Sequence, residues 1–159
     1  MATIKKYEHP IVKYSELAAQ RRGLIINRTI DLEKVIDWRI SIYYCKDKAS
    51  CDELAEMVIS ALTLRDKIRI LIFVLKKYDP EIFKVHSSLK RHLEKIRDNR
   101  NKMAHSWLDA TVTFVGNRHK FKPTISNFKS KGETDLYDEK RIKALENMII
   151  KYTHVLTNW

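Results

Sequence analysis

Apolar residues recur three and four positions apart along most of the chain, which is the spacing of one face of an α-helix. Each such stripe predicts a helix that packs its apolar face against the others. The predicted helices cover residues 15–44, 51–62, 64–78, 81–104 and 136–157. Residues 1–14 precede the first stripe and are predicted to form an N-terminal arm.

Capping and stop signals mark the boundaries between the predicted helices. Thr63 stands at an expected N-cap, and Asp66 follows three residues later as in a capping box. Asp79 can cap a helix and Pro80 tolerates the first turn, so the pair ends one helix and starts the next. The polar stretch 46–50 predicts a loop. The helix after this loop is predicted to bury Leu54, Met57, Val58 and Ala61.

Between residues 109 and 132 the spacing changes from the helical period to alternation. Residues 111–115 (Thr-Val-Thr-Phe-Val) alternate with β-branched residues, residues 116–117 (Gly-Asn) offer a turn, and the alternation then resumes. Pro123 lacks an N–H donor and is predicted to confine the second strand to an edge of the sheet. The fold class that follows is mainly α: an up-and-down helical bundle in one domain, 1–159, with a β-hairpin inserted before the last helix.

The composition suits a globular helical protein with a core of its own. The chain has 159 residues, of which 44% are hydrophobic and 32% charged, with only 3 Gly and 3 Pro. So few turn-forming residues argue against an all-β fold. The longest apolar run, Ile70–Leu75, is too short to span a bilayer, and residues 1–6 lack the apolar core of a signal peptide. The sequence therefore predicts a cytoplasmic protein with no membrane partner.

Positive charge is concentrated in two stretches of the chain. There are 31 Lys and Arg against 20 Asp and Glu, a net charge of +11. Residues 84–102 contribute +5 and residues 117–131 another +5, so the rest of the chain is nearly neutral. Clustered positive charge attracts a polyanion, and for a cytoplasmic protein this predicts nucleic acid. Alternatively, the two basic stretches form an ordinary solvated surface or a binding surface for an acidic partner protein.

The two cysteines, Cys45 and Cys51, do not indicate a metal centre. A disulfide is not expected in a reducing compartment, and two Cys with no nearby His make a poor zinc site. We therefore expect ordinary thiols, no metal and no cofactor.

One hexapeptide, 100–105, combines an arginine and a histidine where a helical stripe ends. Arg100 interrupts the apolar stripe, and because a buried charge is costly in a monomer core it is predicted to face a cleft or a subunit seam. Its guanidinium keeps its charge and can clamp phosphate oxygens. His105 follows at the expected helix C-terminus, and an imidazole can carry a proton near neutral pH. The helical period puts Arg97, Asn101 and His105 on one face.

The hexapeptide resembles the signature of HEPN domains. That signature is Arg, four to six residues and then His, with a polar residue, often Asn, directly after the Arg. Arg100, Asn101 and His105 match it. Residues 32–37 look like the acidic first helix of several such domains. Residues 64–71 are similar to a lysine-bearing segment that precedes the motif helix in one subgroup.

The resemblance covers most of residues 15–157 and implies both an assembly and an activity. HEPN domains commonly pair as two-fold dimers whose motif helices meet, and the active members are endoribonucleases that require no metal. The chain is therefore expected to be a HEPN-like homodimer that cleaves RNA, as a toxin or defence component. An antitoxin or a nucleotidyltransferase-like protein is its candidate protein partner.

Carried onto this chain, the resemblance assigns roles to the matching residues. His105 would assist attack by the ribose 2′-hydroxyl or protonate the leaving 5′-oxygen, and Arg100 would stabilise charge on the phosphate. Asn101 would position His105 or the substrate. Glu33 and Asp37 would orient Arg100. The predicted RNA contacts are Arg97, Lys102, Arg118, Lys120 and Lys122.

Other interpretations of the same residues stay open. His105 can simply cap the helix end, and Arg100 can pair with Glu33 or Asp37 as a structural contact. The chain would then be a non-catalytic dimeric HEPN domain with a regulatory or nucleic-acid-binding role. A module that binds nucleic acid through the basic hairpin alone is a further alternative. The histidines predicted to lie on the surface are His86 and His92.

Overall fold

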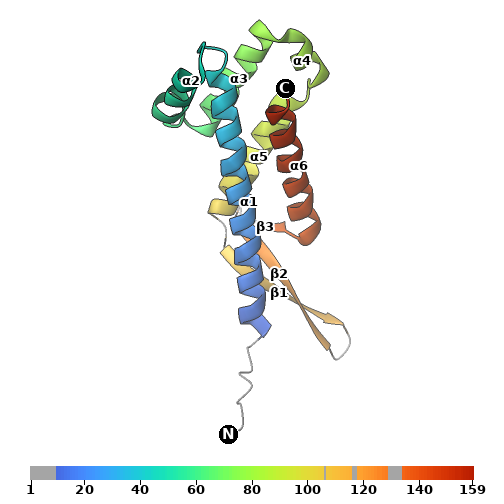
Figure 1. Cartoon of the computed structure of the whole chain (residues 1–159). Helices are drawn as coiled ribbons and strands as arrows, with labels where there is room; N and C mark the ends of the chain where they lie inside the picture. Colours follow the sequence, from blue (N-terminus) through green and yellow to red (C-terminus); the bar gives the residue numbers. More distant parts are fainter. Residues whose placement is uncertain (1–9, 106, 116–117, 129–133) are drawn as a thin grey trace.

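The computed structural model describes residues 10–105, 107–115, 118–128 and 134–159 (Figure 1). Its elements, in chain order, are α1 (Pro10–Ser41), α2 (Lys48–Leu54), the π-helical turn η1 (Ala55–Ile59), α3 (Leu64–Tyr78), α4 (Pro80–Val85), α5 (Leu89–Ala104), β1 (Trp107–Val115), β2 (Arg118–Phe128), β3 (Thr134–Tyr137) and α6 (Glu139–Thr157). Across these described ranges, no helix has the length and apolar content needed to cross a membrane.

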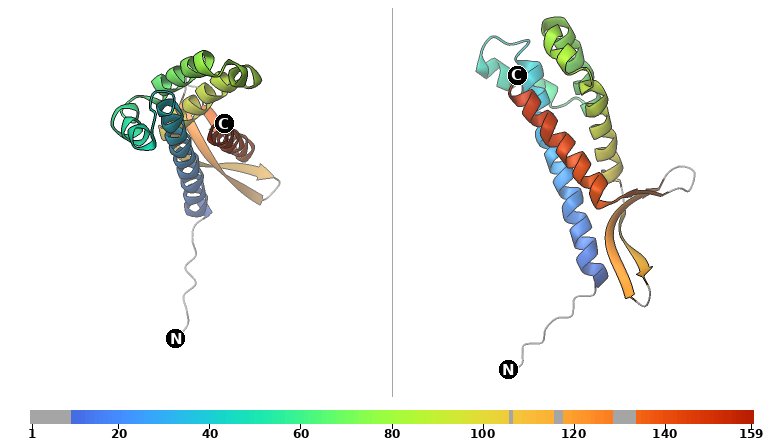
Figure 2. Two further views of the ribbon diagram at one scale, coloured as in Figure 1. Left: turned by 45° about the horizontal axis from the view of Figure 1, so that its top comes forward. Right: turned by 90° about the vertical axis from the view of Figure 1, so that its right-hand side faces the viewer.

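The helices form a bundle around α1, with one continuous hydrophobic core. α3, α5 and α6 all pack against α1, which has 32 residues and is therefore about 48 Å long (Figure 2). Side chains buried in this core include Ile25, Leu32, Ile36, Ile68, Leu71, Leu93, Ile96, Leu145, Ile149 and Leu156. The prediction of a mainly helical bundle is confirmed, because the apolar stripes do face one another.

A three-stranded sheet lies at the end of the bundle where α5 ends and α6 begins, beside the N-terminal half of α1 (Figure 2). β1 and β2 pair antiparallel, from Trp107 opposite Ser126 to Val115 opposite Arg118. These strands fall largely within the segment 109–132 for which the sequence predicts a hairpin. The predicted turn residues, 116–117, lie outside the described part of the chain.

The third strand was not predicted, and it changes the position of Pro123. β3 pairs with β2, so β2 is the middle strand of the sheet and the prediction of an edge strand is wrong for the strand as a whole. The pairing with β3 covers only residues 125–128 of β2. At Pro123 the strand therefore has β1 as its one neighbour, and the missing N–H donor is tolerated there.

The first and the last helix begin at other residues than predicted. α1 begins at Pro10, five residues before the predicted start. Proline suits the first turn of a helix because backbone N–H groups there have no acceptor within the helix, so the N–H that proline lacks is not needed. The last helix begins at Glu139, because residues 134–137 pair as β3. The Asp138 side chain accepts a hydrogen bond from the Arg141 backbone N–H at 2.8 Å and caps this helix.

The second helix was predicted with the wrong start and the wrong buried face. It begins at Lys48, because the Asp47 carboxylate accepts a hydrogen bond from the Ser50 backbone N–H at 2.9 Å and caps it. Its last turn is the π-helical turn η1, which rotates the following side chains relative to an α-helix. Met57 and Val58 lie within this turn and are 71% and 55% exposed instead of buried.

The predicted 81–104 helix is two helices, α4 and α5, separated at residues 86–88. His86 ends α4 with a non-helical backbone (φ −106°, ψ 43°), and α5 begins at Leu89. The signals on either side of α3 are confirmed. The Thr63 hydroxyl oxygen accepts a hydrogen bond from the Asp66 backbone N–H at 3.3 Å, and Pro80 occupies the first turn of α4.

A buried arginine joins the C-terminal ends of α1 and α6. Arg39 is 6% exposed, and its guanidinium donates hydrogen bonds to the backbone carbonyls of Leu156, Thr157 and Trp159. The last carbonyls of a helix lack partners within the helix, so a cation placed there both satisfies them and complements the helix dipole. This contact holds α6 against α1 at the end of the bundle away from the sheet.

His92 is half-buried against α6, whereas a surface position was predicted. Its Nδ1 hydrogen-bonds the hydroxyl of Tyr152, a residue of α6 that is 2% exposed, and this hydroxyl is also 3.3 Å from Ser88 Oγ. Burial lowers the pKa of His92, and the positive charges of Arg91 and Lys151 lower it further. The neutral imidazole can then accept a hydrogen bond from the Tyr152 hydroxyl through Nδ1.

The lowered pKa of His92 predicts that the protein loses stability in mild acid. The folded state binds a proton at His92 less tightly than the unfolded chain, whose histidine has a pKa of about 6.5. Neutral His92 therefore contributes fully to the free energy of unfolding above about pH 6.5, and this contribution is lost as the pH falls below that value. Urea unfolding across this pH range should show a shallower decline for His92→Gln than for the natural chain. The matched control, His154→Gln at an exposed position of α6, should keep the natural decline.

Candidate functional site

The C-terminal half of α5 borders a small polar cavity of about 260 Å³. Its other walls are α1 and the segment that leads into α3. The polar residues that line it are Glu33, Thr63, Arg65, Arg97, Arg100 and Asn101. Three of the residues predicted from the hexapeptide and its helix, Arg97, Arg100 and Asn101, therefore share one cavity.

Arg100 is half-buried at this cavity and has no carboxylate partner in the described part of the chain. Its Nη1 donates a hydrogen bond to Asn101 Oδ1 at 3.2 Å. Arg97, one turn earlier, donates two hydrogen bonds to the neighbouring Asp98 carboxylate at 2.9 and 2.6 Å. Arg100 is thus a guanidinium that an anion can still approach, because its present contact is a neutral amide.

His105 is the C-cap of α5, as predicted, but it does not line the cavity that holds Arg100. Its backbone N–H bonds the Asn101 carbonyl at 3.3 Å, and its side chain is exposed. Residues five positions apart on a helix point about 140° away from each other. The side chains of Arg100 and His105 therefore point to different parts of the surface.

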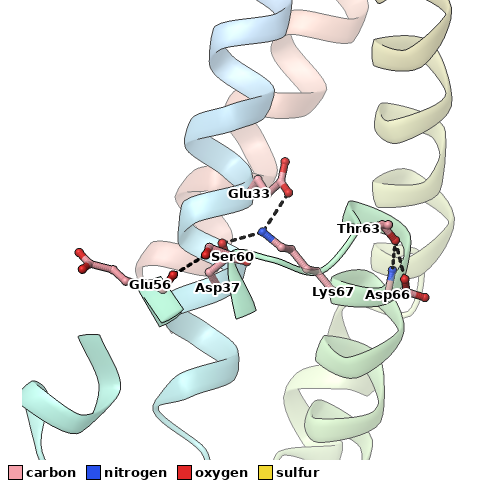
Figure 3. A network of polar contacts seen from close by, with 7 residues as sticks. All are labelled: Glu33, Asp37, Glu56, Ser60, Thr63, Asp66 and Lys67. Carbon is pink, nitrogen blue, oxygen red and sulfur yellow. Dashed lines mark hydrogen bonds and ion pairs between the residues drawn. The ribbon is translucent and has the colours of Figure 1, made fainter. Parts of the chain in front are cut away.

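The acidic residues predicted to orient Arg100 contact a different cation. Lys67 extends from α3 toward α1, with its ammonium 2.9 Å from Glu33 Oε1 and 2.8 Å from Asp37 Oδ2 (Figure 3). Lys67 is 2% exposed, so this ion pair is largely removed from water. The prediction for Glu33 and Asp37 is corrected accordingly, although Glu33 also lines the cavity.

Asp37 is held in a strongly desolvated position. Burial raises its pKa, and this effect exceeds the opposite effects of the hydrogen bond and the positive charge of Lys67. Its Oδ2 accepts the bond from Lys67, while its Oδ1 has no hydrogen-bond partner among the residues that the structure describes. The network is consequently sensitive to any loss of the lysine charge.

Neither Lys67 nor Arg65 was predicted as a site residue, although both lie in the lysine-bearing segment 64–71 on which part of the resemblance rests. Lys67 falls within the apolar stripe that includes Leu64, Ile68 and Leu71, and a charged residue inside such a stripe is the signal that identified Arg100. Arg65 carries no comparable signal, because an exposed basic residue in the first turn of a helix is ordinary. Its relevance comes from its place in the cavity wall.

The remaining predicted RNA contacts belong to α5 and to β2. Lys102 is exposed in the last turn of α5. Arg118, Lys120 and Lys122 belong to β2, and their side chains lie outside the described residues. Cys45 and Cys51 are free thiols, and where side chains are described no cluster of His, Cys, Asp and Glu could hold a metal ion.

Fold and cavity together define a basic helical-bundle protein with an arginine-lined polar site. Comparison with known proteins adds no relative: the chain matches no protein-family model, no curated protein and no solved structure.

Proposed function

We propose that the chain is a metal-independent endoribonuclease of HEPN type that acts as a homodimer, in a toxin or defence role. The observation that carries this proposal is Arg100, a half-buried guanidinium with no carboxylate partner where the structure describes the chain, in a cavity next to the helix end that presents His105. An arginine so placed suits a phosphate group, whose oxygens accept paired hydrogen bonds from its planar fork. RNA is the substrate class because histidine chemistry without a metal needs the ribose 2′-hydroxyl.

The proposed active site combines residues from two subunits. Within one subunit His105 does not line the Arg100 cavity, so the proposal does not place both groups of one subunit at the same phosphate. A two-fold axis near the C-terminus of α5 would bring His105 of one protomer to Arg100 of its partner, and would create two equivalent sites. Asn101, exposed and bonded to Arg100, would hold the guanidinium in position.

The proposed reaction is internal transesterification. The 2′-oxygen forms a bond to phosphorus while the bond from phosphorus to the 5′-oxygen breaks, giving a 2′,3′-cyclic phosphate and a free 5′-hydroxyl. His105 takes the proton of the 2′-hydroxyl or gives one to the leaving 5′-oxygen, with water as the other proton partner. Arg100 stabilises the charge that develops on the phosphate.

The surrounding charge supports binding of single-stranded RNA. α5 carries much of the basic stretch 84–102, and β1 begins only two residues after His105. The paired strand β2 contains Arg118, Lys120 and Lys122, so both basic stretches lead to the same end of the bundle. A strand of RNA could be held there by backbone contacts on both sides of the scissile phosphate.

The experiment is incubation of the purified chain with mixed RNA and with DNA of the same sequence, in the presence of EDTA. RNA cleavage with 2′,3′-cyclic phosphate ends and intact DNA is the expected result. Light scattering of the same preparation should give the mass of a dimer. Intact RNA at micromolar protein concentration, or equal cleavage of DNA, would overturn the proposal.

A non-catalytic dimeric HEPN module is the second candidate, and one observation favours it: Arg100 and His105 do not meet within the subunit. This candidate predicts salt-dependent binding of RNA without cleavage. The assay above separates the two, because the binding module leaves RNA intact while retaining it in a mobility shift.

A further inference from the structure

We infer that the α5 cavity is a phosphate subsite whose third cation is Arg65, and that Lys67 keeps it selective for anions by neutralising Glu33. The identity of the ligand, a backbone phosphate of RNA next to the cleaved one, rests on the proposed function. The subsite extends the recognised surface beyond the hexapeptide to the first turn of α3, on the wall opposite α5.

The charge of the cavity wall carries the argument. Within the described ranges, the charged residues that line it are Arg65, Arg97, Arg100 and one carboxylate, that of Glu33. Glu33 already has a cation at 2.9 Å in Lys67, whose side chain is 3% exposed and therefore interacts strongly. Arg97 is paired with Asp98 at 2.6 Å. Arg65 and Arg100 therefore supply the net positive charge of the cavity, which attracts an anion.

Arg65 is only weakly neutralised by its own neighbours. Its nearest carboxylate oxygen, on Asp66, is 3.8 Å away. That carboxylate also accepts a hydrogen bond from the Thr63 hydroxyl at 2.6 Å and lies 3.6 Å from Arg69. Since the Arg65 side chain is 67% exposed, it can turn toward a ligand in the cavity.

The size of the cavity restricts what the cations can bind. About 260 Å³ is below the range of roughly 300–1,000 Å³ that holds whole small-molecule ligands. A phosphate group with its adjoining oxygens fits this space better than a base with its sugar. Arginine forks from two walls can bind non-bridging oxygens in pairs, which suits a diester in a strand.

The test is binding of a 2′-O-methyl RNA oligonucleotide, which cannot be cleaved, over a series of salt concentrations. Arg65→Ala should weaken binding about tenfold, the effect of losing one charge-assisted contact. It should also reduce the slope of log K against log salt by about 0.7, the value for one phosphate contact on a single strand. Arg69→Ala, one turn along α3 and 73% exposed, is the matched control and should leave both quantities unchanged.

A second variant tests the neutralisation of Glu33. Glu33→Gln removes the carboxylate of the cavity and leaves Lys67 paired with Asp37, so it should bind the same oligonucleotide more tightly than the natural chain. Equal behaviour of Arg65→Ala and Arg69→Ala, or weaker binding by a folded Glu33→Gln, would overturn the inference. Failure to bind the oligonucleotide at all would also overturn it and would point to an acidic protein as the ligand.

The two proposals fail separately. A chain that cleaves no RNA but shows the Arg65→Ala effect has the phosphate subsite without the proposed activity. For a chain that does cleave RNA, Arg65→Ala should raise KM and leave kcat nearly unchanged, because Arg65 contacts a flanking phosphate and not the reacting one.

Discussion

Lys67→Met is expected to lower the free energy of unfolding by about 3 kcal/mol near neutral pH. The variant keeps the length of the side chain but removes the one cation between Glu33 and Asp37. Two carboxylates, with side chains 23% and 9% exposed, would then face the vacated position without compensation. Urea unfolding followed by circular dichroism measures the loss.

The pH dependence of this variant identifies the cause. Burial raises the pKa of Asp37 even beside Lys67, and without the lysine nothing opposes that rise. The folded variant then binds a proton at Asp37 more tightly than the unfolded chain does, so its stability increases as the pH falls toward that raised pKa. The deficit relative to the natural chain should therefore be largest near neutral pH and smaller in acid.

Two further variants complete the test of the network. Asp37→Asn combined with Lys67→Met should recover part of the loss, because the carboxylate without a partner is gone. Arg69→Ala, an exposed residue of the same helix, should change stability by no more than about 0.5 kcal/mol. A loss below about 1 kcal/mol for Lys67→Met, or a loss independent of pH, would show that the buried ion pair contributes little.

The periodic part of the fold could be predicted because each stripe must be buried by another. Leu93, Ile96 and Met103 recur at helical spacing and are buried, and the same logic holds for Leu32 and Ile36. Features that arise from local backbone geometry were not predictable in this way. The break at residues 86–88 has no Gly or Pro, and the turn η1 has no sequence signal that separates it from an α-helix.

The candidate site was predictable only as far as it lies on one helix. The helical period places Arg97, Arg100 and Asn101 near one another, and they share a cavity. The pairing of Lys67 with Glu33 instead depends on how α3 is positioned against α1, which no local pattern specifies. The packing of the helices brings distant segments together, so the place of Arg65 in the cavity wall could not be predicted from the sequence around it.

His105→Ala is expected to reduce RNA cleavage about 10³-fold while leaving RNA binding nearly intact. The side chain is exposed at the end of α5, so its loss removes proton transfer and little stability. Arg100→Ala should reduce cleavage by a similar factor and should also weaken binding, because its guanidinium contacts the phosphate. Initial rates with saturating RNA, compared with a filter-binding curve, measure both effects.

The controls for these variants carry the same residue types elsewhere. His154→Ala, exposed on α6, and Arg69→Ala, exposed on α3, should both cleave RNA at the natural rate. Full activity in His105→Ala would mean that another group transfers the proton, or that a contaminating nuclease is present. Equal losses in His105→Ala and His154→Ala would point to a general effect of the substitutions on folding.

Mixing the two inactive variants tests whether the site spans two subunits. His105→Ala keeps Arg100, and Arg100→Ala keeps His105, so a mixed dimer would contain one intact site and one site that lacks both groups. In an equal mixture that exchanges subunits, half of the dimers are mixed, and activity should return to about one quarter of the natural value. Differently tagged subunits show whether mixed dimers form. If they form and no activity returns, the arginine and the histidine do not act across the two-fold axis, because a shared site must be completed by the partner.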